Sequence, residues 1–222
     1  MELIKIKLFN TLEEAELAKI KEMANERIYP KGTTVFVSGQ KTDGLYVICS
    51  GRVKVLMLYP DGREKTLAIL REGEILGEVT LYGSELRSAT VVTLETTTFL
   101  FIAQENFQAL LLSIPRLSVR IIELLSRRLR GANRQIEELT FLNARSRVIC
   151  GLICLAEEHG CEAGRETELL FPLTHNELAQ FVGVSRETTT KVLNELRKKA
   201  LISTNRGRIS VPDQAALQRQ VF

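Results

Sequence analysis

The chain has 222 residues, of which 45% are apolar and 26% are charged, and these values exclude a disordered chain. The longest apolar runs, such as residues 107–114, fall far short of the roughly 20 residues of a membrane-spanning helix, and the charged N-terminus lacks a signal-peptide core. A net charge of +3 does not by itself indicate a nucleic-acid partner. We therefore expect a cytoplasmic protein with no membrane partner.

Residues 30–103 carry the pattern of an antiparallel β domain. Short runs rich in Val, Ile, Leu, Thr and Tyr alternate with glycine-containing breaks, and the expected strands are 33–37, 45–48, 53–58, 65–70, 89–94 and 97–102. Regularly spaced short strands with turn signals are typical of a sandwich or barrel. Asp61-Gly62 predicts a hairpin between the third and fourth of these strands.

Two opposite charges, Glu78 and Arg87, lie within this predicted β region. A buried charge needs an ionic partner or a bound ligand, so the two residues form either a structural salt bridge with each other or part of a binding site. Arg87 is followed by Ser88, and a guanidinium fork beside a hydroxyl suits a phosphate group. Glu78 would accept a hydrogen bond from a ribose hydroxyl.

A long helix is predicted over residues 116–142, which contain no proline and a single glycine. Its apolar residues recur at spacings of four and three, as in a two-stranded coiled coil, at Leu125, Leu129, Ala132, Ile136 and Leu139. The flanking positions are rich in Arg, Glu and Gln, which suits a symmetric partner. We expect a dimerisation helix; packing against the chain's own domain is the alternative.

Residues 143–222 form a mainly helical unit in this prediction. We expect helices over 144–159, 174–181 and 186–199, a polar loop over 160–168, a strand over 169–172, and a hairpin of 201–204 and 208–211. Thr174 with Glu177 three residues later is a capping box. Gly183 ends the second helix, and Ser185 caps the third.

The two short helices joined by Gly-Val-Ser have the spacing of a helix-turn-helix. Residues 186–208 contain seven Lys or Arg and two Glu, a local charge of +5 that exceeds the total for the chain. Recognition helices place their N-terminal residues against base edges in the major groove. A two-helix packing unit with a charged solvent face is the alternative. We predict DNA binding by Thr174, Ser185, Arg186, Glu187, Thr189, Lys191 and Arg206.

The four cysteines, Cys49, Cys150, Cys154 and Cys161, lack the CxxC spacing of common zinc and redox sites. Cys150 and Cys154 share one face of an apolar helix, where free cysteines usually pack as small core residues; a redox or metal site is the alternative. The sequence has no P-loop and no nucleophile elbow. We therefore predict neither an enzyme nor a metal cofactor.

Several motifs, taken in order, resemble those of the bacterial cyclic-AMP receptor protein/FNR-type (Crp/Fnr) transcription regulators. They are YVICSGRVKV, ILREGEILGE, the cassette GE…RSA, QIEELTFLNARSRV and ELAQFVGVSRETTTKVLNEL. The resemblance implies an α+β chain: an antiparallel β-roll of the jelly-roll, cyclic-nucleotide-binding type in 1–115, a dimerisation helix in 116–142, and a winged helix-turn-helix domain in 143–222. It also implies a homodimer on a palindromic DNA operator, and an activator's contact with RNA polymerase in loop 157–168.

The resemblance further implies a small effector, with cyclic AMP favoured among cyclic nucleotides. Glu78 is matched to the ribose 2′-hydroxyl, and Arg87 and Ser88 to the cyclic phosphate; Gly77 and Ala89 would contribute backbone, and Leu67 and Leu70 would wall the base. The cyclic-AMP receptor uses a threonine and a serine on its long helix to bind adenine. The matching residues here are Ala132 and Asn133, so Asn133 alone could bond to the base, and the effector's base stays open.

Two other functions stay open at this point. The same scaffold could be a redox- or metal-responsive regulator, or a regulator that needs no effector. A cyclic-nucleotide-binding module of an enzyme or channel is the third possibility, against which the helix-turn-helix and the wing argue.

Overall fold

The structure is a computed structural model that describes residues 3, 6–80, 86–163, 166–205 and 207–221. The chain divides into two compact units, residues 1–131 and 132–222. The boundary between them falls inside the long helix α3 (Pro115–Phe141).

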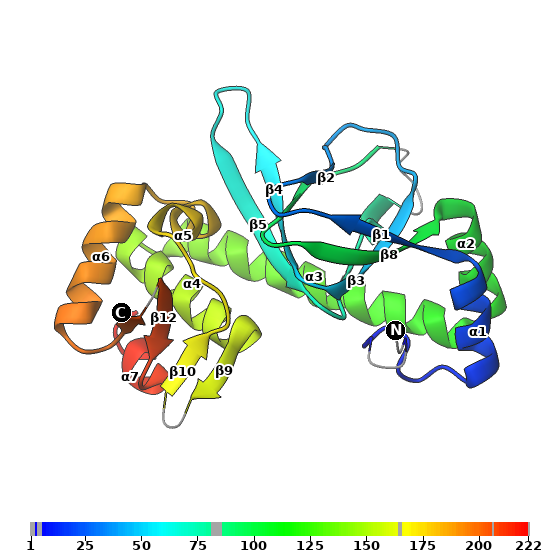
Figure 1. The fold of residues 1–222 in the computed structure, drawn as a ribbon. Helices are drawn as coiled ribbons and strands as arrows, with labels where there is room; N and C mark the ends of the chain where they lie inside the picture. The colour runs from blue at the N-terminus through cyan, green and yellow to red at the C-terminus, as the bar shows by residue number, and fades with distance from the viewer. Residues whose placement is uncertain (1–2, 4–5, 81–85, 164–165, 206, 222) are drawn as a thin grey trace. The chain divides into compact units, whose positions relative to one another are not determined.

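The first unit is built on two four-stranded antiparallel sheets, with strand orders β1-β8-β3-β6 and β2-β7-β4-β5 (Figure 1). The strands are β1 (Ala24–Tyr29), β2 (Thr34–Phe36), β3 (Gly44–Ser50), β4 (Arg52–Leu58), β5 (Glu64–Arg71), β6 (Ile75–Leu76), β7 (Thr90–Thr93) and β8 (Thr97–Ala103). The predicted antiparallel β-roll is confirmed, and all six expected strands are present. Strands β1 and β6 were not predicted, because β1 is polar and half exposed and β6 has only two residues.

The hairpin predicted at Asp61-Gly62 joins β4 to β5. Gly62 has φ +83°, and the Tyr59 amide donates to the Arg63 carbonyl across the turn at 2.9 Å. The register of this pair shifts so that Leu67 is an extra residue in β5, which is a β-bulge.

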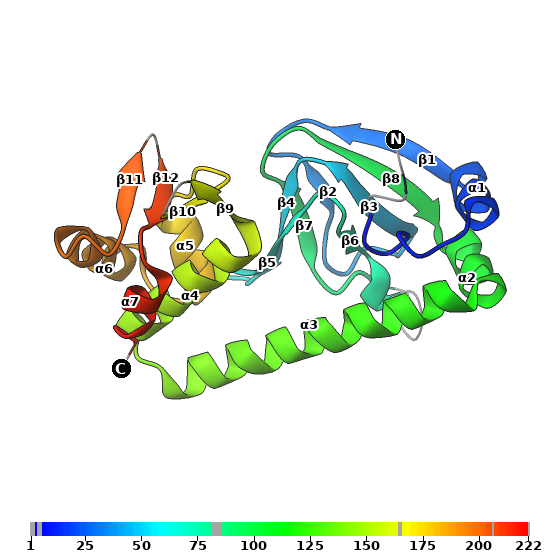
Figure 2. The same cartoon turned by 90° about the horizontal axis from the view of Figure 1, so that it is seen from below.

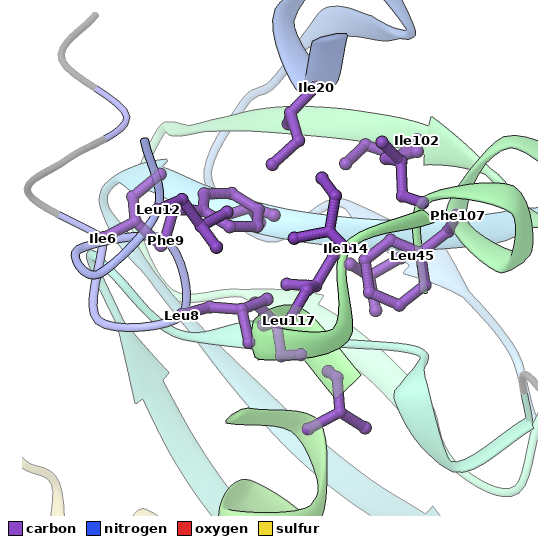
Figure 3. Packing of buried hydrophobic residues seen from close by; sticks show 14 of the residues in the cluster. Ile6, Leu8, Phe9, Leu12, Ile20, Leu45, Ile102, Phe107, Ile114 and Leu117 are labelled. Carbon is purple, nitrogen blue, oxygen red and sulfur yellow. The ribbon is translucent and has the colours of Figure 1, made fainter. Parts of the chain in front are cut away.

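Two hydrophobic clusters hold this unit together. One lies between the two sheets and contains Tyr46, Phe99 and Val91. The other packs the N-terminal segment, α1 (Glu14–Glu22), α2 (Gln104–Ser113) and the start of α3 against the sheet that contains β3 and β8 (Figure 3). The side chains of Phe9 and Phe107 are fully buried there. This second cluster fixes the first turns of α3 to the roll.

Helix α3 spans 27 residues, as predicted, and is a single unbroken helix (Figure 2). Leu117 and Ile121 on one face are buried in the core. The large apolar residues of the predicted seam lie on another face and are between 38% and 64% exposed; they are Leu125, Leu129, Ile136 and Leu139. Two further exposed apolar residues, Val119 and Ile122, precede them on the helix. The seam is therefore left open in the single chain.

The second unit combines helices with a four-stranded antiparallel sheet of order β11-β12-β10-β9. Its elements are α4 (Ala144–His159), β9 (Gly160–Ala163), β10 (Glu166–Leu169), α5 (His175–Val182), α6 (Arg186–Lys198), β11 (Ser203–Asn205), β12 (Arg208–Val211) and α7 (Gln214–Gln218). The predicted helices and the final hairpin are confirmed. The polar loop expected over 160–168 is wrong, as is the strand over 169–172, because β9 and β10 form a hairpin there. Strand β10 also pairs with the distant β12.

The local signals around the helix-turn-helix are confirmed. Thr174 accepts a hydrogen bond from the Glu177 amide at 3.1 Å and its own amide donates to the Glu177 carboxylate at 2.8 Å, which completes the capping box. Gly183 is left-handed with φ +69°, and Ser185 caps α6 by accepting from the Thr188 amide at 3.1 Å. These caps fix where α5 ends and α6 begins.

Candidate functional site

A small cavity of about 60 Å³ lies in the β-roll, beside the segment that follows β6. Its lining contains the predicted Leu70, Gly77, Glu78, Arg87, Ser88 and Ala89, together with Phe36, Val55, Leu76, Val79, Val91 and Arg128. Leu67, the extra residue of the β-bulge, is not part of this lining, and its predicted contact with a base stays a prediction.

Gly77 sits where two chain segments approach closely. Its φ is +93°, a conformation that favours glycine. A side chain at this position would collide with the Arg87 guanidinium and would come within 2.8 Å of the Gly44 carbonyl. Glycine is therefore required here both by the backbone and by the arginine that lies over it.

The guanidinium of Arg87 has one paired nitrogen and two unpaired ones. The residue is 2% exposed; Nη2 donates to the Asp43 carboxylate and, at 2.8 Å, to the Gly44 carbonyl. The guanidinium also stacks on Phe36 at 4.1 Å from the ring centre. Within the described part of the chain, Nε and Nη1 have no hydrogen-bond partner. Buried donors without partners are unfavourable, so these two nitrogens are suited to an anionic ligand.

Asp43 is held in turn by residues that the sequence did not single out. Its second oxygen accepts from the Tyr46 hydroxyl at 3.1 Å, and Arg27 lies 3.5 Å away. Arg27 also donates to the Tyr46 hydroxyl at 2.8 Å and stacks on Phe101. Burial, followed by the Asp43 charge, raises the pKa of Tyr46, so the phenol stays protonated and donates. The available signal was Asp43 itself, a charged residue immediately before the apolar strand β3.

Glu78 begins a short 3₁₀ turn (Glu78–Thr80), and its side chain is fully buried. The salt bridge between Glu78 and Arg87 that the sequence left open is not formed. Oε1 of Glu78 instead pairs with Arg128 of α3, whose Nη2 also donates to the Ile75 carbonyl at 2.5 Å. Oε2 has no partner among the described residues. Arg128 was predicted only as a charged flank of the helix, because nothing local links it to the roll.

The exposed side of α6 forms a shallow recess in the second unit. Its lining is Arg186, Glu187, Thr190, Lys191, Asn194, Glu195 and Lys198. Arg186, Glu187 and Lys191 were predicted to bind DNA, and all three are exposed. Hydrogen bonds from its own amide and from the Ser185 hydroxyl lower the pKa of Glu187, so it is an anionic acceptor. Cations with one acceptor on one helix face suit a DNA groove.

The remaining predicted contacts have different outcomes. The expectation for Thr189 is wrong, because this residue is fully buried and its hydroxyl donates to the Ser185 carbonyl at 3.0 Å. Thr190 takes the outward position and lies 2.9 Å from Nδ1 of His175. Thr174 is exposed at the start of α5. Arg206 lies outside the described residues.

Asn133 belongs to the second unit and is exposed on α3. A contact between Asn133 and the base of an effector in the β-roll would involve residues of both units, and it stays a prediction.

Burial makes three of the four cysteines less acidic. Burial raises the pKa of Cys49 to about 11 and that of Cys154 to about 12, and it also raises the pKa of Cys150. Thiols with raised pKa values are poor nucleophiles and poor metal ligands. The described residues contain no group of three or more potential metal ligands, and none of the described helices is long and apolar enough to cross a membrane.

Comparisons with known proteins agree with both halves of this description. Residues 26–113 match the family model of the cyclic nucleotide-binding domain, and residues 146–220 match that of the Crp-like helix-turn-helix domain. The chain is 33% identical over 215 residues to the cyclic AMP receptor protein of Thermus thermophilus, covering 97% of this chain and 96% of the relative.

Two further relatives extend the comparison. The CRP-like cAMP-activated global transcriptional regulator of Mycobacterium tuberculosis is 29% identical, over 96% of this chain and 95% of its own. The solved structure of the c-di-GMP responsive global regulator CLP of Xanthomonas campestris has a TM-score of 0.79 and 27% identity, over 90% of this chain and 100% of the other. With its cyclic-nucleotide-binding domain and its helix-turn-helix, the chain belongs to the Crp/Fnr family of DNA-binding transcription regulators.

Proposed function

We propose that the protein is a homodimeric transcription regulator whose binding to DNA is gated by a cyclic nucleotide in the β-roll. One observation carries the effector part. The unpaired Nε and Nη1 of Arg87 and the unpartnered Oε2 of Glu78 are buried in the lining of one cavity. Charged donors and an acceptor in the same small site match a phosphate and a hydroxyl of one ligand.

Cyclic AMP is the first candidate for this ligand. Two of the relatives above are named for cyclic AMP, whereas the Xanthomonas regulator is described as responsive to c-di-GMP. The apolar part of the lining, from Val55 and Leu70 to Val79, suits a base without selecting one. The phosphate end of the proposed site is therefore better supported than the base end.

The proposed gate is the pair of Glu78 with Arg128. Arg128 lies in the lining of the cavity, on the carboxylate that a ribose would take, so a ligand there would have to displace it. Arg128 is the one lining residue that comes from α3, and its pair with Glu78 uses the carboxylate assigned to the ribose. A ligand that competes for Glu78 would change how α3 is held to the roll, and by linkage DNA would tighten ligand binding in return.

The proposed dimer is supported by the open seam on α3. Five apolar residues from Ile122 to Leu139 follow coiled-coil spacing, and together with the neighbouring Val119 they are more than a third exposed in the single chain. A second copy of the same helix would cover them, as in a symmetric interface. Two copies would also supply two recognition helices for the two halves of a palindrome.

Calorimetry and DNA binding test the proposal together. The purified full-length protein is titrated with cyclic AMP, cyclic GMP and c-di-GMP, and its affinity is measured for a duplex that it has selected from a random-sequence pool. We expect one cyclic nucleotide to bind and to raise the DNA affinity. DNA binding that ignores all three nucleotides, without calorimetric heat, would contradict the effector part and leave the DNA-binding part standing.

A regulator that needs no effector is the second candidate. The observation in its favour is the same ion pair, because Arg128 already occupies one carboxylate oxygen of Glu78 and leaves little free volume. The titration above separates the two candidates.

A further inference from the structure

Arg145 occupies an unusual place for a basic residue. It is the second residue of α4, next to the N-cap Asn143. The N-terminus of a helix carries a partial positive charge, so an arginine in the first turn is unfavourable unless another partner holds it. Its position therefore points to a specific contact rather than to helix stability.

That contact joins three segments of the second unit. Nη2 and Nε of Arg145 lie 3.1 and 3.4 Å from the two carboxylate oxygens of Glu195 on α6. Nη1 donates to the Gln220 carbonyl at 2.5 Å, and the neighbouring Ser146 hydroxyl donates to the Val221 carbonyl. A planar fork on a carboxylate fixes direction as well as distance. One guanidinium thus ties the start of α4 to α6 and to the chain after α7.

Glu195 lies on the side of α6 that also presents its DNA-binding residues. It lines the same recess as Arg186 and Lys191. Lys199 adds a second ion pair at 2.9 Å, and the two cations, Arg145 first, lower the pKa of Glu195 to about 2. The carboxylate therefore stays ionised, the two neighbouring cations balance its charge, and Arg145 ties it to α4.

Core packing and the ion pair restrain α6 from different sides. Val192 and Leu196 bury the inner face of the helix, and their close packing sets its depth and its approximate rotation. A bidentate ion pair on one flank adds a directional restraint, which fixes that rotation more narrowly.

We propose that Arg145 is a positioning residue for DNA recognition, which acts through Glu195 to set the rotation of α6 toward the bases. The inference rests on the DNA-binding function of the family and is independent of any effector.

The competing role for Arg145 is a direct contact with a DNA phosphate, and the two roles differ in what they change. A phosphate contact contributes to binding of every sequence and to the salt dependence. A positioning residue contributes to the preference for the right sequence. An arginine that needs its fork is also not replaced by lysine.

The test uses the full-length protein on two duplexes: one selected by the wild type from a random-sequence pool, and a shuffled duplex of the same composition. The variants are R145M, R145K, E195Q and the double variant R145M/E195Q. R219M is the matched control, because Arg219 is 70% exposed and 4.0 Å from Asp213 in the same unit. Wild-type binding to the selected duplex tests the family function itself, separately from the variants.

We expect R145M and R145K each to lose about fivefold in affinity for the selected duplex, the factor that corresponds to about 1 kcal/mol for an ion pair. Binding to the shuffled duplex and the salt slope should stay at the wild-type value. E195Q should lower the ratio of the two affinities as well, and the double variant should be no worse than either single one. R219M should change nothing.

Three results would overturn the proposal: an equal loss on both duplexes with the salt slope reduced by about one, wild-type behaviour of R145K, or additive losses in the double variant. Circular dichroism and thermal unfolding verify that each variant folds. If the R145 variants do not fold, E195Q decides alone, since an unchanged ratio of affinities in E195Q contradicts the proposal.

Discussion

Replacing Arg87 by leucine removes the two unpaired donors, Nε and Nη1, from the cavity while keeping an apolar side chain beside the ring of Phe36. The change also removes the bonds to Asp43 and to the Gly44 carbonyl. Asp43 keeps Tyr46 and Arg27 as partners, and its side chain is 49% exposed, so water can solvate it. We therefore expect a folded protein with stability reduced by about 1–3 kcal/mol.

The effect on the effector is larger than the effect on the fold. Nε and Nη1 of Arg87 are buried and have no partner among the described residues, and hydrogen bonds to charged groups contribute about 1.5–3 kcal/mol each. The loss of both amounts to about 3–6 kcal/mol, which corresponds to roughly a hundredfold to ten-thousandfold weaker binding. Lysine at this position would keep the charge but offer a single point of contact, so R87K should fall between the wild type and R87L.

Calorimetry with cyclic AMP measures these affinities, and thermal unfolding of the free proteins measures the cost to the fold. The signature of the proposed role is an effector affinity that falls far more than the stability does, with loss of any effector-dependent change in DNA binding. If R87L bound the nucleotide within tenfold of the wild type, the assignment of Nε and Nη1 of Arg87 to the phosphate would be wrong.

Three further predictions use matched positions in the chain. G77A should lower the free energy of unfolding by about 2 kcal/mol and bind the effector more weakly in calorimetry. G73A is the control, because Gly73 has φ +84° but open space around it, and this variant should show only the backbone strain. Equal effects of the two substitutions would refute the clash with the guanidinium. L129E should turn a dimer into a monomer in sedimentation velocity, whereas L112E, at a residue 83% exposed outside the seam, should not. The pKa of Glu195 is about 2, below its ordinary 4.5, so the stability that its ion pairs contribute is full above pH 4.5 and is lost toward pH 2. The difference in denaturation midpoint between the wild type and E195Q should therefore shrink as the pH falls through this range. A constant difference would count against the ion pairs.

Much of the fold follows from signals that lie within a few residues of each other. The hairpin at Asp61-Gly62, the capping box at Thr174, the left-handed Gly183 and the seam of α3 each depend on local geometry, and each is present in the structure. The elements that sequence reasoning missed depend on distant partners. Strand β1 exists because it pairs with β8, and β10 because it pairs with β12.

The candidate site divides in the same way. Glu78, Arg87 and Ser88 were identified from the sequence because charged and hydroxyl groups in a β region need a reason to be there. The partners of the two charged residues were not identified, because Asp43 is 44 residues from Arg87 in the chain and Arg128 is 50 residues from Glu78. An ion pair between such residues depends on how sheets and helices pack.

By itself the sequence of this protein determined a β-roll, a long helix with an apolar seam, and a capped helix-turn-helix, because periodicity, caps and turns are properties of neighbouring residues. Only the tertiary structure decided that Thr189 is buried while Thr190 faces outward, that Arg87 keeps two nitrogens unpaired, and that Arg145 is tied to Glu195. These outcomes depend on the rotation of a helix and on which distant groups share a buried volume, and both are set by the packing of the whole unit.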